Sequence, residues 1–198
     1  VLDRAALRRI DHLCVEQFGL PTLTLMENAG REAALEAMTA VAGAAAGGVV
    51  VVCGRGNNGG DGLAAARHLA NFGAAVAVLL AQPPEGFSGD AAVNLGVVRR
   101  MGLRMAVAPA QGADGSLERL ERDLPGGRAG VVVDALFGTG VDRPIEGAPA
   151  ELIGEINRAR RRGSVVVSVD LPSGMDCDTG RGWAAGVAGG MVEADVIV

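Results

Sequence analysis

The chain has 198 residues, a formal net charge of −5, and 49% hydrophobic against 21% charged residues. These values suit a folded globular domain and exclude a disordered chain. The acidic balance argues against a nucleic-acid-binding protein, whose phosphate contacts need a basic surface. All 18 basic residues are arginines. A Walker-type phosphate loop, a kinase-type strand lysine and Schiff-base chemistry are therefore excluded within this chain.

The cysteines and the N-terminal residues indicate the cellular compartment of the protein. Cys14, Cys53 and Cys177 are odd in number and match no zinc-binding spacing, so we expect free thiols in a reducing environment. No apolar run approaches the roughly 18 residues that a membrane span needs. The charges of Asp3 and Arg4 do not fit a secretory signal. We therefore expect a cytoplasmic protein that binds neither membrane nor nucleic acid.

Short runs of apolar, often β-branched residues predict strands, and helical patterns lie before and between them. In chain order, the expected helices and strands are Asp3–Gln17 (helix), Arg31–Ala46 (helix), Val49–Cys53 (strand), Asp61–Phe72 (helix), Ala75–Leu80 (strand), Ala91–Met101 (helix), Leu103–Val107 (strand), Leu117–Leu124 (helix), Val131–Val133 (strand), a helix that begins at Pro149, Val165–Val169 (strand) and Ala194–Val198 (strand). Strands that are apolar throughout are typical of a parallel sheet covered on both faces.

This alternation of strands and helices predicts an α/β fold. We expect a Rossmann-like, doubly wound, mainly parallel sheet in a three-layer α/β/α sandwich. No linker divides the chain, which indicates a single domain over residues 1–198. The last apolar run reaches Val198 without a following element, so we expect the C-terminal end of the domain to be incomplete.

A glycine-rich segment follows the strand Val49–Cys53 and contains a G-x-G-x-x-G pattern at Gly54, Gly56 and Gly59. A strand, a glycine turn and a helix N-terminus together favour an anion site built from backbone N–H groups. A nicotinamide dehydrogenase is disfavoured, because residues 62–84 lack the acidic residue that would hold the ribose. Asp61, inside the segment, would repel a phosphate but could hold a hydroxyl, an amide or a cation.

Two further strand ends carry polar residues. Asp134 follows the strand Val131–Val133, and Asp170 follows Val165–Val169, with Ser173 three residues further on. Ligands of open α/β sheets bind at the carboxyl ends of the strands, so these residues are candidates for a binding site.

The sequence lacks the signatures of hydrolytic catalysis by serine and histidine. A serine hydrolase is disfavoured, because no G-x-S-x-G motif occurs. The two histidines, His12 and His68, fit surface or packing positions better than a catalytic role.

Asn58, Asp134 and Ser173 are expected to converge at this edge of the sheet as oxygen ligands. A single carboxylate with an amide and a hydroxyl is a weak ligand set for Mg²⁺ or Ca²⁺, which usually recruit more carboxylates. The charge of the set favours a monovalent cation such as K⁺.

Four stretches, in this order, resemble one known family: Leu25-Met26-Glu27-Asn28-Ala29-Gly30, Gly56-Asn57-Asn58-Gly59-Gly60-Asp61-Gly62, Asp134-Ala135-Leu136-Phe137-Gly138-Thr139-Gly140 and Val169-Asp170-Leu171-Pro172-Ser173-Gly174. The chain resembles the NAD(P)H-hydrate epimerases, the YjeF N-terminal domain family. The resemblance implies an isomerase that interconverts the R and S forms of hydrated NADH and NADPH (NADHX and NADPHX). It also implies a homodimer and a functional partner, an ADP- or ATP-dependent dehydratase that is fused to the domain in many bacterial proteins.

The resemblance also implies site residues. The residues expected to bind the hydrate are Asn57, Asn58, Gly59, Gly60, Asp61, Gly138, Thr139, Gly140, Val141, Asp142, Arg143, Pro144 and Asp170. Those expected to bind K⁺ are Asn58, Asp134 and Ser173. We expect Asp170 to be the catalytic residue, because it ends a central strand and lies outside the cation set, and Asp61 is the second candidate.

Two questions stay open at this point. Arg55, Arg67 and Arg143 are candidate contacts for the 2′-phosphate that distinguishes NADPHX from NADHX. The alternative to an enzyme is a catalytically silent ligand-binding or scaffold domain of the same fold, like the YjeF-like domain of a messenger-RNA decapping scaffold.

Overall fold

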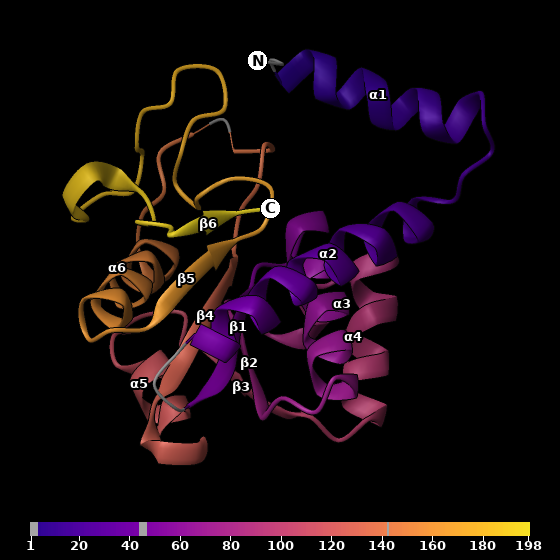
Figure 1. The fold of residues 1–198 in the computed structure, drawn as a ribbon. Coiled ribbons are helices and arrows are strands. Elements are labelled where there is room, and N and C mark those ends of the chain that lie inside the picture. Colours follow the sequence, from indigo (N-terminus) through magenta and orange to yellow (C-terminus); the bar gives the residue numbers. More distant parts are fainter. Residues whose placement is uncertain (1–3, 44–46, 142) are drawn as a thin grey trace.

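The computed structural model describes residues 4–43, 47–141 and 143–198 (Figure 1). Its centre is a six-stranded sheet in the order β3-β2-β1-β4-β5-β6, in which every pair of neighbours is parallel. The strands are β1 (Gly48–Cys53), β2 (Val76–Leu80), β3 (Arg104–Val107), β4 (Ala129–Ala135), β5 (Val165–Ser168) and β6 (Val196–Ile197). The α/β fold with a parallel sheet is confirmed. The strand order reverses between β1 and β4, which is where such sheets bind ligands.

Helices cover both faces of the sheet, as the apolar strands predict. The helices are α1 (Arg4–Glu16), α2 (Thr22–Gly43), α3 (Asn57–Asn71), α4 (Gly89–Arg100), α5 (Ser116–Glu121) and α6 (Ala148–Arg161), with short 3₁₀ turns at Pro84–Gly86, Pro125–Gly127 and Ala188–Gly190. Val49 and Val51 of β1 pack in the core under α2, α3 and α4, whereas Val50 and Val52 pack in the core under α5 and α6. Helix α1 stands clear of both layers (Figure 1).

No helix in the described ranges is both long enough and apolar enough to cross a membrane.

Helix α2 begins at Thr22 rather than at the expected Arg31, and the last expected residues, 44–46, lie outside the described ranges. Gly30 lies inside this helix, where it crosses α3. A Cβ atom at Gly30 would lie 2.5 Å from the Cβ of Ala64 and 2.8 Å from the carbonyl oxygen of Asp61. The glycine therefore allows two helices to approach closely and does not end the helix, which is why the expected start was wrong.

Helix α3 begins at Asn57, four residues before the expected start at Asp61. After the short turn at residues 54–56, the rest of the glycine-rich segment thus forms the first turns of a helix rather than a loop. A Cβ atom at Gly59 would overlap the carbonyl oxygen of Gly54, and one at Gly62 would overlap the Cβ of Ala135. Small residues at these positions let the start of α3 lie directly against β1 and β4.

We expect Gly62→Ala to destabilise the protein, because the added methyl group has no space beside Ala135 in β4. Overpacking of this kind typically lowers the free energy of unfolding by about 1–3 kcal/mol. The matched control is Gly154→Ala in α6, where a Cβ meets nothing closer than 3.5 Å and helix propensity favours alanine by about 1 kcal/mol. Urea unfolding of both variants checks the prediction. A Gly62→Ala variant as stable as the control would contradict the close packing of α3.

Candidate active site

A buried carboxylate, Asp134, joins the ends of β4 and β5. It accepts hydrogen bonds from the hydroxyl and the backbone N–H of Ser173, at 2.5 and 2.8 Å, from the hydroxyl of Ser168 at 2.8 Å, and from the N–H of Leu136 at 3.3 Å. Burial raises the pKa of Asp134, and these hydrogen bonds oppose that rise because they favour the ionised form. Contrary to expectation, Asp134 lies inside β4 and not after it, because the ladder with β1 continues through Ala135.

Asp170 follows β5 in a left-handed turn. Its φ of 66° is the only positive value at a non-glycine residue in the described ranges, a conformation that asparagine and aspartate tolerate best among the larger residues. The carboxylate accepts a hydrogen bond of 2.6 Å from the N–H of Thr139. A Cβ atom at Gly138 would overlap this carboxylate. The turn after β5 and the glycine after β4 therefore place Asp170 against the β4 loop.

Asn58 has a buried side-chain amide without a partner. The residue is 9% exposed, and neither its Oδ1 nor its Nδ2 makes a hydrogen bond. Its Cγ would lie 3.3 Å from a Cβ placed on Gly138, so the amide lies beside the β4 loop. Buried polar groups are almost always hydrogen-bonded, and an amide left free at a cavity indicates a group that receives a ligand.

Asp61, in the second turn of α3, is held in its protonated form. Its pKa is raised to about 8, mainly by burial, then by the negative charges of Asp170 and Asp11. At neutral pH the site therefore holds a protonated carboxyl group in the electrostatic field of Asp170. A pair of carboxyl groups in different environments is a common arrangement for general acid and general base catalysis.

These residues surround a cavity of about 1070 Å³ above the carboxyl ends of β1, β4 and β5. The expected hydrate-binding residues that line it are Asn57, Asn58, Asp61, Gly138, Thr139, Gly140, Val141, Arg143, Pro144 and Asp170. Gly59 and Gly60 do not line it, because they are buried by the packing of α3. Asp142 lies outside the described residues.

The expected cation set is only partly brought together. Asp134 and Ser173 are hydrogen-bonded to each other, and neither lines the cavity. Asn58 lines the cavity and contacts neither of them by a hydrogen bond. Within the described part of the chain, no three His, Cys, Asp or Glu side chains gather as a metal site. One carboxylate, one free amide and one hydroxyl suit a weakly held monovalent cation rather than a divalent one.

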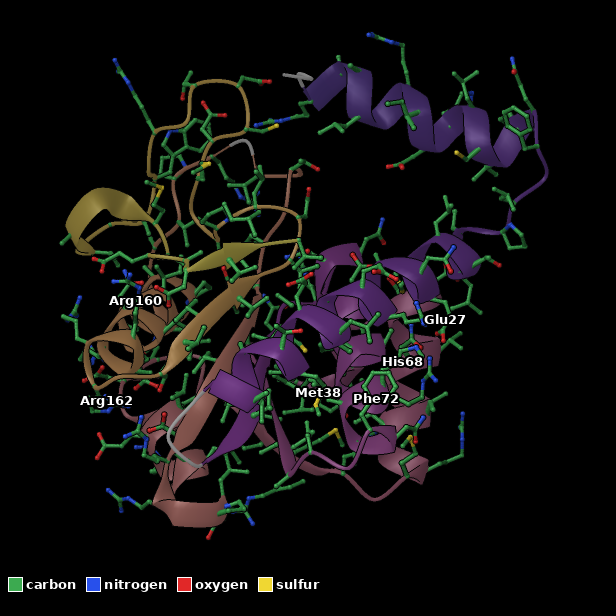
Figure 2. All side chains as sticks on the ribbon, in the orientation of Figure 1. Glu27, Met38, His68, Phe72, Arg160 and Arg162 are labelled. Atoms are coloured by element: carbon green, nitrogen blue, oxygen red, sulfur yellow. The ribbon has the colours of Figure 1, made fainter. Side chains whose placement is uncertain are left out.

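The histidines and Arg67 lie outside the cavity. His68 pairs with Glu27 at 2.8 Å, and Figure 2 shows these two side chains next to each other. Arg67 forms an ion pair with the same glutamate and does not line the cavity. His12 is exposed on α1. Arg55 and Arg143, by contrast, line the cavity.

Sequence reasoning missed part of the cavity wall. Leu7, Ile10 and Asp11 of α1 line it, as does Glu32 of α2. The first three share one face of an amphipathic helix, and their spacing in the sequence indicates such a face. The spacing does not indicate that this face lines a cavity.

The comparisons with known proteins agree with this architecture. Residues 22–198 match the family model described as YjeF-related protein N-terminus. An NAD(P)H-hydrate epimerase from Pirellula staleyi is 38% identical, and the match covers 99% of this chain and 79% of that protein. The bifunctional NAD(P)H-hydrate repair enzyme Nnr of Moorella thermoacetica is 40% identical over 91% of this chain. The match covers 33% of that enzyme, so the chain spans about a third of the length of such bifunctional relatives.

A solved structure has the same fold. The crystal structure of yeast ynu0 superposes on the whole of this chain, and on 78% of its own, with a TM-score of 0.80 and 25% sequence identity. The family match, the relatives and this fold agree, and the chain therefore belongs to the YjeF-related N-terminal domain family.

Proposed function

We propose that this chain is an NAD(P)H-hydrate epimerase, which interconverts the R and S forms of NADHX and NADPHX. The observation that carries the proposal is the pairing of a protonated Asp61 with Asp170 in one cavity, beside the free amide of Asn58. The names of the relatives support the substrate class. The cavity, at about 1070 Å³, has the volume of a site for a large ligand.

The reaction requires one proton donor and one proton acceptor. The hydrated ring carries a hydroxyl at C6, next to the ring nitrogen. The nitrogen lone pair expels this hydroxyl as water once it is protonated, which leaves a planar iminium ion. Water then adds to either face and gives up a proton. In our proposal Asp170 is the catalytic carboxylate that takes a proton from the incoming water, and Asp61 protonates the departing oxygen.

We expect Asp170→Asn to lower kcat by at least about a hundredfold, because the amide cannot accept a proton. Asparagine tolerates the left-handed turn at this position, so the fold should be retained. The measurement is conversion of (R)-NADHX to the S form by chiral chromatography, corrected for the slow uncatalysed rate. Asp123→Asn, an exposed aspartate paired with Arg104, is the matched control. Near-normal turnover by Asp170→Asn would show that Asp170 is not the catalytic carboxylate.

The raised pKa of Asp61 predicts a pH-dependent stability. Between its ordinary pKa of 3.8 and its folded value of about 8, the unfolded chain loses this proton and the folded protein keeps it. The carboxyl group therefore lowers the free energy of unfolding increasingly as pH rises through this window, and the effect levels off above it. We expect Asp61→Asn to melt several degrees above the wild type at about pH 8 and to differ little at about pH 4. Circular dichroism melts across this range test it. A difference that does not vary with pH would contradict the assignment.

We further propose that the site binds K⁺ through Asn58, Asp134 and Ser173. The free Oδ1 of Asn58 and the negative charge of Asp134 support this set. A bound cation would supply positive charge beneath the loops that hold the substrate.

A K⁺ site predicts that the protein melts at a higher temperature in KCl than in choline chloride of equal ionic strength, because a ligand of the folded state stabilises it. Asn58→Ala should remove this difference. Asn57→Ala, an exposed neighbour in the same turn, should keep it. Equal melting temperatures of the wild type in the two salts would exclude the K⁺ site.

The proposed function includes a partner enzyme, an oligomeric state and a cellular location. The bifunctional relatives support a dehydratase as functional partner. A homodimer is supported by exposed apolar side chains after α1, with Phe18 74% and Leu20 40% exposed. The cytoplasmic location stays a prediction.

A further inference from the structure

Helix α1 forms part of the cavity wall although it lies outside the stretch that matches the family model, residues 22–198. Leu7, Ile10 and Asp11 face the cavity, and their spacing of three and four residues places them on one side of the helix. The start of α3 and the loop after β4 line the same cavity. The helix therefore forms one wall of the cavity, and the segments that carry the family's motifs form others.

One arginine holds this wall in place. The guanidinium of Arg4 donates hydrogen bonds to the carbonyl oxygen of Val141 at 2.7 Å and to Asp176 at 3.0 Å. The backbone N–H of Arg4 also donates to Asp178 at 3.2 Å. Val141 belongs to the cavity-lining loop after β4, and the two aspartates belong to the segment that follows Asp170. A single residue thus links α1 to both loops that carry the site.

The apolar side chains of this wall remain partly uncovered. Ile10 is 46% exposed although it faces the cavity, and Leu7 is half-buried. An apolar side chain that faces a cavity rather than the core gains most when a flat, largely apolar group covers it. The ring system of a nicotinamide nucleotide has this character.

We propose that α1 is a substrate-contacting wall of the active site, and that Arg4 is the positioning residue that holds it over the cavity. The identity of the ligand, a hydrated nicotinamide nucleotide, rests on the proposed function. Leu7 and Ile10 contact the bound nucleotide, and Asp11 sets the charge at this side of the cavity.

Asp11 gives the wall an electrostatic effect as well as a steric one. The charged groups that face Asp61 are Asp170 from the turn after β5 and Asp11 from α1, whose negative charges both raise its pKa. Glu32 of α2 and Arg55 before α3 line the same cavity. Removing the charge of Asp11 therefore lowers the pKa of Asp61, and activity that needs protonated Asp61 is then lost at a lower pH.

The test compares Arg4→Ala with Arg9→Ala, an exposed arginine on the same helix. We expect Arg4→Ala to raise KM for the hydrate about tenfold, which corresponds to losing one charge-assisted contact, while kcat stays within about twofold. Arg9→Ala should leave both unchanged, and Arg4→Lys should recover part of the loss. Asp11→Asn should shift the alkaline limb of the rate profile to lower pH. Unchanged KM in Arg4→Ala would overturn the proposal.

A second measurement does not depend on turnover. Hydrogen exchange of the wild type with NADP⁺ as probe should slow in the amides of α1 as well as in the first turns of α3. In Arg4→Ala, only the α3 amides should be protected. Protection of α3 without α1 in the wild type overturns the proposal, even if the enzyme is an active epimerase. Protection of α1 by NADP⁺ in a protein without epimerase activity supports it and rejects the proposed function. Absence of protection in both helices also overturns the proposal for α1, whereas the proposed function is decided separately by conversion of (R)-NADHX.

Discussion

Asp134 is the residue on which the geometry of the site depends. Its carboxylate is fully buried at the point where the strand order reverses, and it accepts hydrogen bonds from three other residues. A buried carboxylate is tolerated only when its oxygens are satisfied, so the backbone at Leu136 and at Ser173 has to lie where these bonds form. The loops after β4 and β5 are thereby tied together below the cavity. Asp170 and Gly138, which lie on these loops, meet at the cavity floor as a result.

Close packing of small residues completes the arrangement. Gly59 and Gly62 let the first turns of α3 lie against Gly54 and Ala135, with no room for a side chain at either glycine. This approach carries Asn58 into the cavity with no protein partner for its amide. The same approach buries Asp61 near Asp170, and burial together with like charge keeps it protonated. The free amide of Asn58 and the raised pKa of Asp61 thus both result from the close packing of α3 against the sheet.

The sheet supports the site, and the residues that form the site belong to the helices and loops attached to the sheet. The first turns of α3 and the loops after β4 and β5 contribute the polar groups, and α1 contributes an apolar wall held in place by Arg4. The fastening uses charge-assisted hydrogen bonds at the edge of the fold, whereas the floor uses buried ones.

Local sequence pattern determined the strands, the parallel sheet and the three strand-end segments. A short run that is apolar throughout indicates a strand covered on both faces, and this can be recognised without knowing which elements pack against it. The motifs also identified Asp61 and Asp170 as members of one site. Only the tertiary structure decided that Asp134 lies beneath the cavity, that Arg67 pairs with Glu27, and that α1 forms a wall. Each of these depends on contacts between residues far apart in the chain, such as the 39 positions between Asp134 and Ser173. Hydrophobic periodicity carries information about the nearest turn or strand, and it carries none about which distant element packs against it.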